Sequence, residues 1–324
     1  MKIIFIFLDG VGLGKASSDA NPFAQVSMPN LEGLLGGHKL VADDAPGAML
    51  VNTQFASLLA VDATMGIEGI PQSATGQAAL LTGKNVPAWL GEHEGPKPTQ
   101  PIVELIKRGT LFSQLLQGGN TISFLNAYPP RYFESIDRDY RLPGVIALSA
   151  KLAGLPLKTK EDLFAGQALS VDFTGEGWRS YLGYPETPIL ELEQAGQRLA
   201  DLTCLADLTV FEYWLTDIAG HHQDALAART ILESLDVVIG SLVGAWDSDQ
   251  GLILLTSDHG NLEDLGNRHH TLNDVPLLLI GSQQLRDEFL LGLISGCRQK
   301  PDLTAIAPAI LKFLEPNQNA PLEQ

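Results

Sequence analysis

Separate stretches of the chain contain the residue types that bind divalent metal ions. Aspartate and histidine are adjacent in Ser-Asp-His-Gly at 257–260, and they recur four positions apart at 217 and 221. Carboxylate oxygens and imidazole nitrogens are ligands for divalent transition metals. Six such ligands suffice for two closely spaced ions, which can lower the pKa of a hydroxyl group and bind a phosphoryl oxygen. The sequence therefore predicts a two-metal centre suited to phosphoryl transfer, with the candidate ligands Asp9, Asp217, His221, Asp258, His259 and His270.

A hydroxyl group that such a centre could activate occurs in QSATGQ at 72–77. Ser73 and Thr75 precede the apolar run Ala78 to Leu81, where a helix is expected to begin. The first turn of a helix has unpaired N–H groups and the positive end of the dipole, so it suits an anion and a nucleophile that receives one. Serine and threonine are also common N-cap residues. On this segment alone an N-cap is the favoured interpretation, and a nucleophile is the alternative.

Three buried strands are expected to bring the acidic residues together. The continuous apolar run Leu252 to Leu255 is typical of a strand buried on both faces, and Lys2 to Leu8 and Leu208 to Leu215 have the same character. An aspartate follows each of them at once or within a few residues. In open α/β sheets, ligands bind at the carboxyl ends of the strands. The sequence therefore predicts an α/β fold with a mostly parallel central sheet and helices on both faces.

The whole chain, 1–324, is expected to form a single catalytic domain. Residues 39–70 show no clear pattern, and residues 128–190 mix aromatic and charged side chains in what we interpret as a small cap or lid insertion. Arginine pairs well with phosphate oxygens, although a solvated surface position is more common for each one singly. The candidates are Arg131, Arg138, Arg141 and Arg179. Helices are expected near 30–35, 101–117, 146–152, 189–202, 225–246 and 303–314, and further strands near 121–125 and 277–280.

Composition excludes several classes of function. The formal net charge of −17 argues against broad binding to nucleic acid or to an anionic membrane, but it leaves room for a phosphate pocket around bound metal ions. The Gly-x-Gly pair at 10–12 lacks the spacing of a dinucleotide site, so no nucleotide cofactor is predicted, and it indicates instead a close approach of the backbone. The expected partner is a small-molecule phosphate ester.

The two cysteines and the first residues bear on the compartment. Cys204 and Cys297 form no disulfide framework and are expected to be buried thiols in a reducing compartment. The apolar run from Ile3 to Leu8 is six residues long and is followed by Asp9, which favours a buried strand over a signal peptide. Because no stretch reaches the length of a membrane span, we expect a soluble, cytoplasmic protein.

Taken together, these motifs resemble the alkaline phosphatase superfamily. The similarity lies in SDHGN at 257–261, HT at 270–271 with Val275-Pro276 close behind, D-x-x-G-H at 217–221, the strand ending in DGxG at 9–12, and QSATGQ at 72–77. The branch that they resemble contains cofactor-independent phosphoglycerate mutase and phosphopentomutase. The resemblance covers roughly residues 1–85 and 200–285. It implies an alkaline phosphatase-like three-layer fold and two divalent metal ions, Mn²⁺ or Zn²⁺, with the mutase-like motifs favouring Mn²⁺.

The resemblance also implies roles for single residues. In the mutases, the phosphorylated Ser or Thr precedes a glycine by three positions, so Ser73, three residues before Gly76, is the expected nucleophile and Thr75 the fallback. His222 and His269 do not fit the motif positions and are expected to be supporting or surface residues. By position, one metal would be held by Asp217, His221 and His270, and the other by Asp9, Asp258, His259 and Ser73.

Three departures from the mutases favour a hydrolase. The 144 positions between Ser73 and Asp217 are few for the inserted domain of the phosphoglycerate mutases, Gln77 replaces a histidine, and the Arg and Lys set of the mutase lid is not recognisable. A mutase must shield its phosphorylated intermediate from water, and a reduced lid suits that task poorly. The sulfatase nucleophile pattern is absent around Ser73. The leading hypothesis is therefore hydrolysis of a phosphate ester through phosphoserine, and the alternatives are a phosphomutase and a metal-binding protein without turnover.

Overall fold

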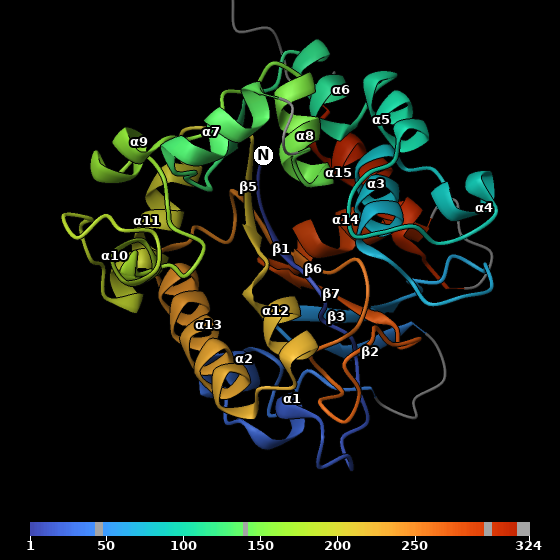
Figure 1. Ribbon diagram of the computed structural model, residues 1–324. Helices are drawn as coiled ribbons and strands as arrows, with labels where there is room; N and C mark the ends of the chain where they lie inside the picture. Colours follow the sequence, from blue (N-terminus) through green and yellow to red (C-terminus); the bar gives the residue numbers. More distant parts are fainter. Residues whose placement is uncertain (43–47, 139–141, 295–299, 316–324) are drawn as a thin grey trace, which may run out of the picture.

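A seven-stranded sheet in the order β2-β3-β7-β6-β1-β5-β4 forms the centre of the computed structural model, which describes residues 1–42, 48–138, 142–294 and 300–315 (Figure 1). The strands β4, β5, β1 and β6 are parallel neighbours. Strand β7 is antiparallel to β6 and β3, and β2 is antiparallel to β3, so the sheet is mostly but not wholly parallel. The strands are β1 Lys2–Leu8, β2 Met49–Asn52, β3 Ala56–Val61, β4 Ile122–Phe124, β5 Leu208–Tyr213, β6 Gly251–Thr256 and β7 Val275–Ile280.

The central strands are buried on both faces, as their continuous apolar runs predict. Along β1, Ile3, Phe5 and Phe7 pack into one core, whereas Ile4 and Ile6 pack into the other. This alternation follows from the two-residue period of a strand. In register, Leu8 of β1 lies beside the end of β5, and Phe7 lies beside the end of β6, so the three carboxyl ends meet at one edge of the sheet.

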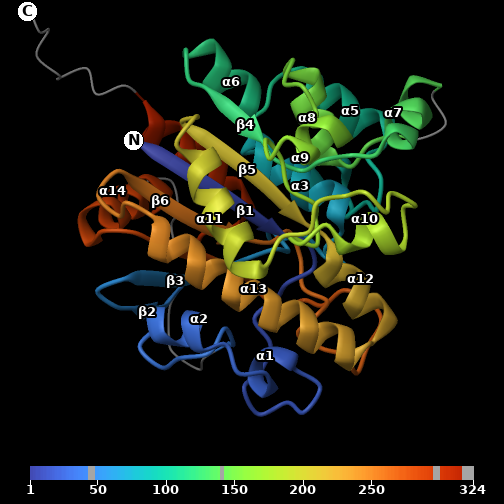
Figure 2. The ribbon, with the colours of Figure 1, turned by 90° about the vertical axis from the view of Figure 1, so that its left-hand side faces the viewer.

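Helices cover both faces of the sheet, which confirms the predicted fold class (Figures 1 and 2). One layer contains α3 Ser73–Thr82, α5 Gln100–Lys107, α6 Leu111–Gln117, α8 Val145–Leu152, α14 Gln283–Ile294 and α15 Ile306–Leu314. The other contains α1 Pro22–Gln25, α2 Pro29–Leu34, α11 Leu192–Thr203 and α13 Ala225–Ala245. Shorter elements are α4 Val86–Leu90, α7 Pro130–Asp137, α9 Lys160–Phe164, α10 Glu176–Ser180, α12 Leu215–His222 and η1 Leu303–Ala305.

Some predicted elements differ from the structure. The single helix expected at 101–117 is two helices, α5 and α6, because Gly109 has a φ of 142° and Thr110 begins α6 in a capping box with Ser113. Residues 39–70, which showed no pattern, contain β2 and β3. Helix α3 begins at Ser73, earlier than the apolar run at 78–81 indicates.

The segment 128–190 contains the four short helices α7 to α10. Helix α8 packs against α3 and α5 and so completes a layer of the core. Arg141, Cys297 and the last nine residues lie outside the described part of the chain. Cys204 is exposed, so the expectation that it is buried is wrong: it caps the carboxyl end of the surface helix α11. Among the described helices, none combines the length and apolar character needed to cross a bilayer.

The edge of the sheet at β2 and β3 is held by a buried arginine. Arg286 of α14 is fully buried and donates hydrogen bonds to Asn52 Oδ1 (2.9 Å), Thr53 O (2.8 Å) and Gly281 O (3.0 Å). It also donates to Ser57 Oγ. A buried guanidinium is energetically unfavourable unless its N–H donors are hydrogen-bonded. Because these oxygens satisfy the donors of Arg286, the side chain holds this part of the sheet to α14.

Candidate metal centre and the adjoining pocket

The predicted ligands lie at the carboxyl edge of the sheet. Asp9 follows β1, and Asp258 and His259 follow β6. Asp217 lies in the first turn of α12, directly after β5. The remaining residues come from α3, α12 and the loop before β7, so that all seven predicted site residues are neighbours: Asp9, Ser73, Asp217, His221, Asp258, His259 and His270.

The first group of side chains surrounds His259. Its Nε2 atom lies 3.0 Å from Ser73 Oγ, 3.5 Å from Asp9 Oδ1 and 3.6 Å from Asp258 Oδ2. Asp258 and His259 are completely buried. The buried Asp9 Oδ1 has no hydrogen-bond partner among the described residues. Burying a carboxylate oxygen without a hydrogen-bond donor costs free energy. This oxygen is therefore suited to ligating a cation.

The second group surrounds Asp217. Its Oδ2 atom is 3.2 Å from His221 Nε2, and its Oδ1 atom is 3.7 Å from His270 Nε2. The two Nε2 atoms are 3.2 Å apart. The His221 side chain is 43% exposed, so this group faces the open side of the site.

The backbone fixes the orientation of these two imidazoles. His221 Nδ1 lies 2.8 Å from the carbonyl oxygen of Arg268, and His270 Nδ1 lies 2.8 Å from that of Pro71. A carbonyl oxygen only accepts, so each Nδ1 carries the proton and each Nε2 presents a lone pair. Lone pairs that face one another and a carboxylate repel unless a cation lies between them. The residues therefore fit a divalent metal.

Burial makes the ionised form of the carboxylates energetically unfavourable unless such a cation is bound. Burial, and then the charges of Asp258, Asp217 and Glu212, raise the pKa of Asp9 well above its usual value. Burial also raises the pKa of Asp258 to about 7. The same desolvation lowers the pKa of His259 and His270, which keeps their imidazoles neutral and free to ligate.

Two overlapping triads of ligand atoms each have the spacing for an ion. One consists of Asp9, Asp258 and His259, and the other of Asp217, His259 and His270, with the atoms of each triad within 4.8 Å of one another. His259 therefore stands between the two groups, and its ring stacks on that of His270 with 3.7 Å between centroids. The family arrangement assigns His259 to the first group and His221 to the second, so the division between the ions remains a proposal.

Ser73 reaches this cluster as the first residue of α3, not as its N-cap. The N-cap is Gln72, and it has no side-chain capping bond. Thr75 Oγ1 donates to the carbonyl oxygens of Gln72 (3.1 Å) and Glu94 (3.3 Å), so it is held by the backbone. A Cβ atom at Gly76 would lie 2.8 Å from the carbonyl oxygen of Asp258, which explains why glycine stands where α3 meets the end of β6.

Glu263 organises the loops around the centre. It is 1% exposed and accepts hydrogen bonds from Gly12 N (2.9 Å), Asn261 N (2.8 Å) and Asn273 Nδ2 (3.0 Å). Thr271 also donates to it. A Cβ atom at Gly12 would lie 2.2 Å from Glu263 Oε1, which confirms the predicted close approach of the glycine-rich turn. Glu263 thus ties together the loops that follow β1 and β6.

Two amides position the aspartates. Gln77 Nε2 donates to Asp258 Oδ2 at 3.0 Å. Asn261 Nδ2 donates to Asp217 Oδ1 at 2.7 Å. Gln77, one of the departures from the mutase pattern, therefore contacts a predicted metal ligand directly.

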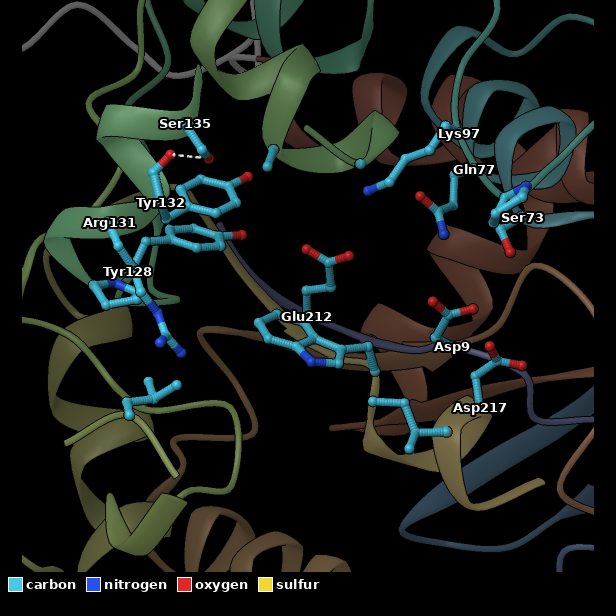
Figure 3. A pocket seen from close by; sticks show the side chains of 17 residues that line it. Asp9, Ser73, Gln77, Lys97, Tyr128, Arg131, Tyr132, Ser135, Glu212 and Asp217 are labelled. Atoms are coloured by element: carbon cyan, nitrogen blue, oxygen red, sulfur yellow. Dashed lines mark hydrogen bonds between the residues drawn. The ribbon is translucent and has the colours of Figure 1, made fainter. Parts of the chain in front are cut away.

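A cavity of about 650 Å³ opens beside the cluster (Figure 3). Its lining includes Asp9, Ser73 and Asp217 at one end and Tyr128 and Tyr132 at the other. The tyrosine rings are stacked with 4.2 Å between centroids. Between the two ends, the carboxylate of Glu212 points into the cavity. Lys97, Arg131 and Trp214 also line the cavity.

The other sequence candidates lie apart from the centre or outside the described residues. His222 and His269 are exposed. Arg138 does not line the cavity, and Arg179 Nε donates to the carbonyl oxygen of Thr187 at 2.7 Å. Of the four arginines proposed as anchors, Arg131 lines the cavity.

Sequence reasoning missed Glu212 and Glu263. A charged residue within the otherwise apolar run LTVFEYWL marks Glu212 as unusual, because a buried strand normally excludes carboxylates. Glu263 follows SDHGN by two positions, and an acidic residue in a polar loop carries no sequence signal of burial.

Comparison with known proteins finds similarity to metalloenzymes. Residues 193–318 match the model of the Metalloenzyme superfamily. The chain is similar to the 2,3-bisphosphoglycerate-independent phosphoglycerate mutase of Rhodopseudomonas palustris, with 31% identity over 40% of this chain and 26% of the relative. It is also similar to that of Gloeobacter violaceus, with 35% identity over 42% of this chain and 28% of the relative. The matches therefore span less than a third of the length of these relatives.

Solved structures share the fold at low sequence identity. The alkaline phosphatase of the Antarctic bacterium TAB5 has a TM-score of 0.54 at 13% identity, covering 98% of both chains. A protein from Pyrococcus horikoshii has a TM-score of 0.55 at 13% identity, covering 97% of this chain and 96% of its own. The resemblance to the alkaline phosphatase-like metalloenzyme superfamily, and to its phosphoglycerate mutase branch, is thereby confirmed.

Proposed function

We propose that this protein is a two-metal phosphoryl-transfer enzyme that hydrolyses a phosphate ester through a phosphoserine at Ser73. The observation that carries the proposal is the position of Ser73. Its Oγ atom lies at the start of α3, 3.0 Å from His259 Nε2, where the ligand cluster meets the cavity. A hydroxyl at a helix N-terminus beside buried carboxylates and imidazoles suits attack on an incoming phosphate.

Two divalent metal ions fit the residues present. Asp9, Asp258, His259 and Ser73 would hold one, and Asp217, His221 and His270 the other. Such ions neutralise phosphoryl charge, lower the pKa of a hydroxyl and stabilise a leaving oxygen. The mixed oxygen and nitrogen ligands suit Mn²⁺ or Zn²⁺. The mutase-like motifs lead us to propose Mn²⁺.

The chain's own residues would then act in two displacements. Ser73 Oγ forms a bond to phosphorus as the ester P–O bond breaks, and the alcohol leaves with a proton. Water next attacks the phosphoserine from the open side near His221, releasing phosphate and restoring the hydroxyl group. The N–H groups of the first turn of α3 favour the negative charge that develops there.

Hydrolysis is proposed over mutase action because of the segment 128–190. Helix α8 packs on α3 and α5, and helix α7 lines the cavity. We propose that the segment forms a small cap that leaves the centre accessible to water. The names of the relatives favour the second candidate, a phosphomutase. A product isomer formed without free phosphate would decide for the mutase.

The test combines metal content with turnover of an aryl phosphate. We expect about two metal ions per chain after loading with Mn²⁺ or Zn²⁺, together with phosphate release. S73A should retain the metal ions and lose turnover. T75V is the matched control, because Thr75 Oγ1 is bonded to the backbone, and it should remain active. Turnover retained in S73A would exclude the covalent mechanism, whereas full metal loading without turnover of any phosphate ester would favour a metal-binding protein that does not catalyse.

A further inference from the structure

Glu212 is a buried carboxylate that faces the cavity outside the ligand cluster. It belongs to β5, and its residue surface is 8% exposed. The side-chain amide of Asn126 clamps its backbone, accepting from Glu212 N at 2.7 Å and donating to Glu212 O at 2.7 Å. The neighbouring Phe211 and Tyr213 pack into the core on the other face of the sheet. The Glu212 carboxylate is thereby directed into the cavity (Figure 3).

The cavity is larger than a phosphate group requires. At about 650 Å³ it has room for a small organic molecule beside the phosphoryl site. Glu212 lies between Asp9 and the stacked rings of Tyr128 and Tyr132, where the alcohol half of a phosphate ester would extend away from Ser73. The alcohol half would therefore contact the carboxylate of Glu212 before it reaches the rings of Tyr128 and Tyr132.

A buried carboxylate restricts what can bind next to it. An apolar group would strip the remaining water from Glu212 without replacing its hydrogen bonds, and a second carboxylate would repel it. The positive charges of Lys97 and Arg131 line the same cavity and oppose a cationic group there, and the charge of Lys97 already acts on Glu212. Hydroxyl groups meet the requirement, since they donate to a carboxylate and carry no charge. Burial raises the pKa of Glu212 to about 7, which shows how incompletely the protein itself solvates this carboxylate.

We propose that Glu212 determines the substrate class by accepting hydrogen bonds from hydroxyl groups on the alcohol half of the ester, so that the enzyme prefers phosphate esters of neutral polyols over esters of hydroxy acids. The inference rests on the proposed function of the Ser73 site. It departs from the substrate that the relatives' names indicate, because phosphoglycerate carries a carboxylate.

A matched pair of ligands tests the proposal. Glycerol 3-phosphate and 3-phosphoglycerate differ in one group, a hydroxymethyl in place of a carboxylate. Their binding to metal-loaded S73A protein is measured by calorimetry, which requires no turnover. We expect S73A to bind glycerol 3-phosphate at least about tenfold more tightly. Equal affinity, or tighter binding of 3-phosphoglycerate, would overturn the proposal.

Variants of Glu212 assign the preference to this residue. In S73A/E212Q, which removes the charge at nearly constant shape, the preference should fall by roughly tenfold, while affinity for an aryl phosphate changes less than about threefold. S73A/E212D is the second variant; it keeps the charge one methylene further from the ligand and should give an intermediate preference. S73A/E134Q, altered at an exposed position outside the cavity wall, is the control. A preference that neither Glu212 variant changes would also refute the inference.

These outcomes are separate from those that test the proposed function. If wild-type protein releases no phosphate from any ester while S73A still discriminates between the two ligands through Glu212, hydrolysis is refuted and the ligand class stands. If phosphate is released but the discrimination is missing, the hydrolase stands and the role of Glu212 is refuted.

Discussion

Asp258→Asn should stabilise the metal-free protein while it removes metal binding. Asp258 is completely buried, and burial raises its pKa from 3.8 to about 7. The shift is about 3 pH units, so ionising this group in the metal-free fold costs about 4 kcal/mol at pH 8. Asparagine has nearly the same shape and still accepts from Gln77 Nε2, which lies 3.0 Å from Asp258 Oδ2. We therefore expect the free energy of unfolding of metal-free D258N at pH 8 to be about 2 to 4 kcal/mol higher than that of metal-free wild type.

The sign of the pH dependence follows from proton binding. The folded protein holds the Asp258 proton more tightly than the unfolded chain, because the folded pKa is the higher one. The stability of metal-free wild type is therefore greatest below the unfolded pKa and falls as the pH rises towards 7. At pH 5 the advantage of D258N should shrink to less than about 2 kcal/mol.

Guanidinium unfolding in EDTA at pH 5 and pH 8, and again with Mn²⁺, measures these differences. With metal the order should reverse, because wild type gains binding free energy that D258N lacks. D249N, at an exposed position, is the control and should match wild type throughout. If D258N is less stable than wild type in EDTA at pH 8, burial of this carboxylate is not the cost that the structure indicates.

Three further predictions concern the supports of the centre. E263Q keeps the shape of a side chain that accepts from Gly12 and Asn261, but it replaces one accepting oxygen by an NH2 group that donates, so metal affinity should fall about 10- to 100-fold in a metal-buffer titration. G12A places a Cβ atom 2.2 Å from Glu263 Oε1, and thermal unfolding should show a loss of about 1 to 3 kcal/mol; stability equal to wild type would contradict the close approach. R286M leaves the carbonyl oxygens of Thr53 and Gly281 without their Arg286 donor and should cost about 3 kcal/mol in urea unfolding, with metal binding retained. Loss of metal binding in folded R286M would contradict its purely structural role.

The sequence predicted most of what lies on the central strands. The runs that form β1 and β6 are almost continuously apolar, and the run that forms β5 is mainly so, because both faces of the sheet are covered, and this leaves a clear signal in the sequence. The aspartates that follow them mark the carboxyl edge. The meeting of these strands depends on parallel pairing, which the α/β pattern implies.

Contacts between distant segments could not be predicted in the same way. Glu263 reads as one more acidic loop residue, and its burial depends on Gly12, 251 positions away in the chain. Glu212 is detectable only as an exception within a strand, because its purpose depends on the cavity built by α7 and the loop at Lys97. The edge strand β2 lacks a clear pattern because it is partly exposed, and its contact with Arg286 of α14 joins segments far apart in the chain.

Anomalous diffraction from crystals grown with Mn²⁺ tests the central claim most directly. Data collected on either side of the manganese absorption edge locate the ions without reference to activity. We predict two peaks, one among Asp9, Asp258 and His259 and the other beside Asp217 and His270, with Ser73 adjoining the first. A single peak within the triad of Asp217, His259 and His270, or none after full loading, would contradict a two-metal centre.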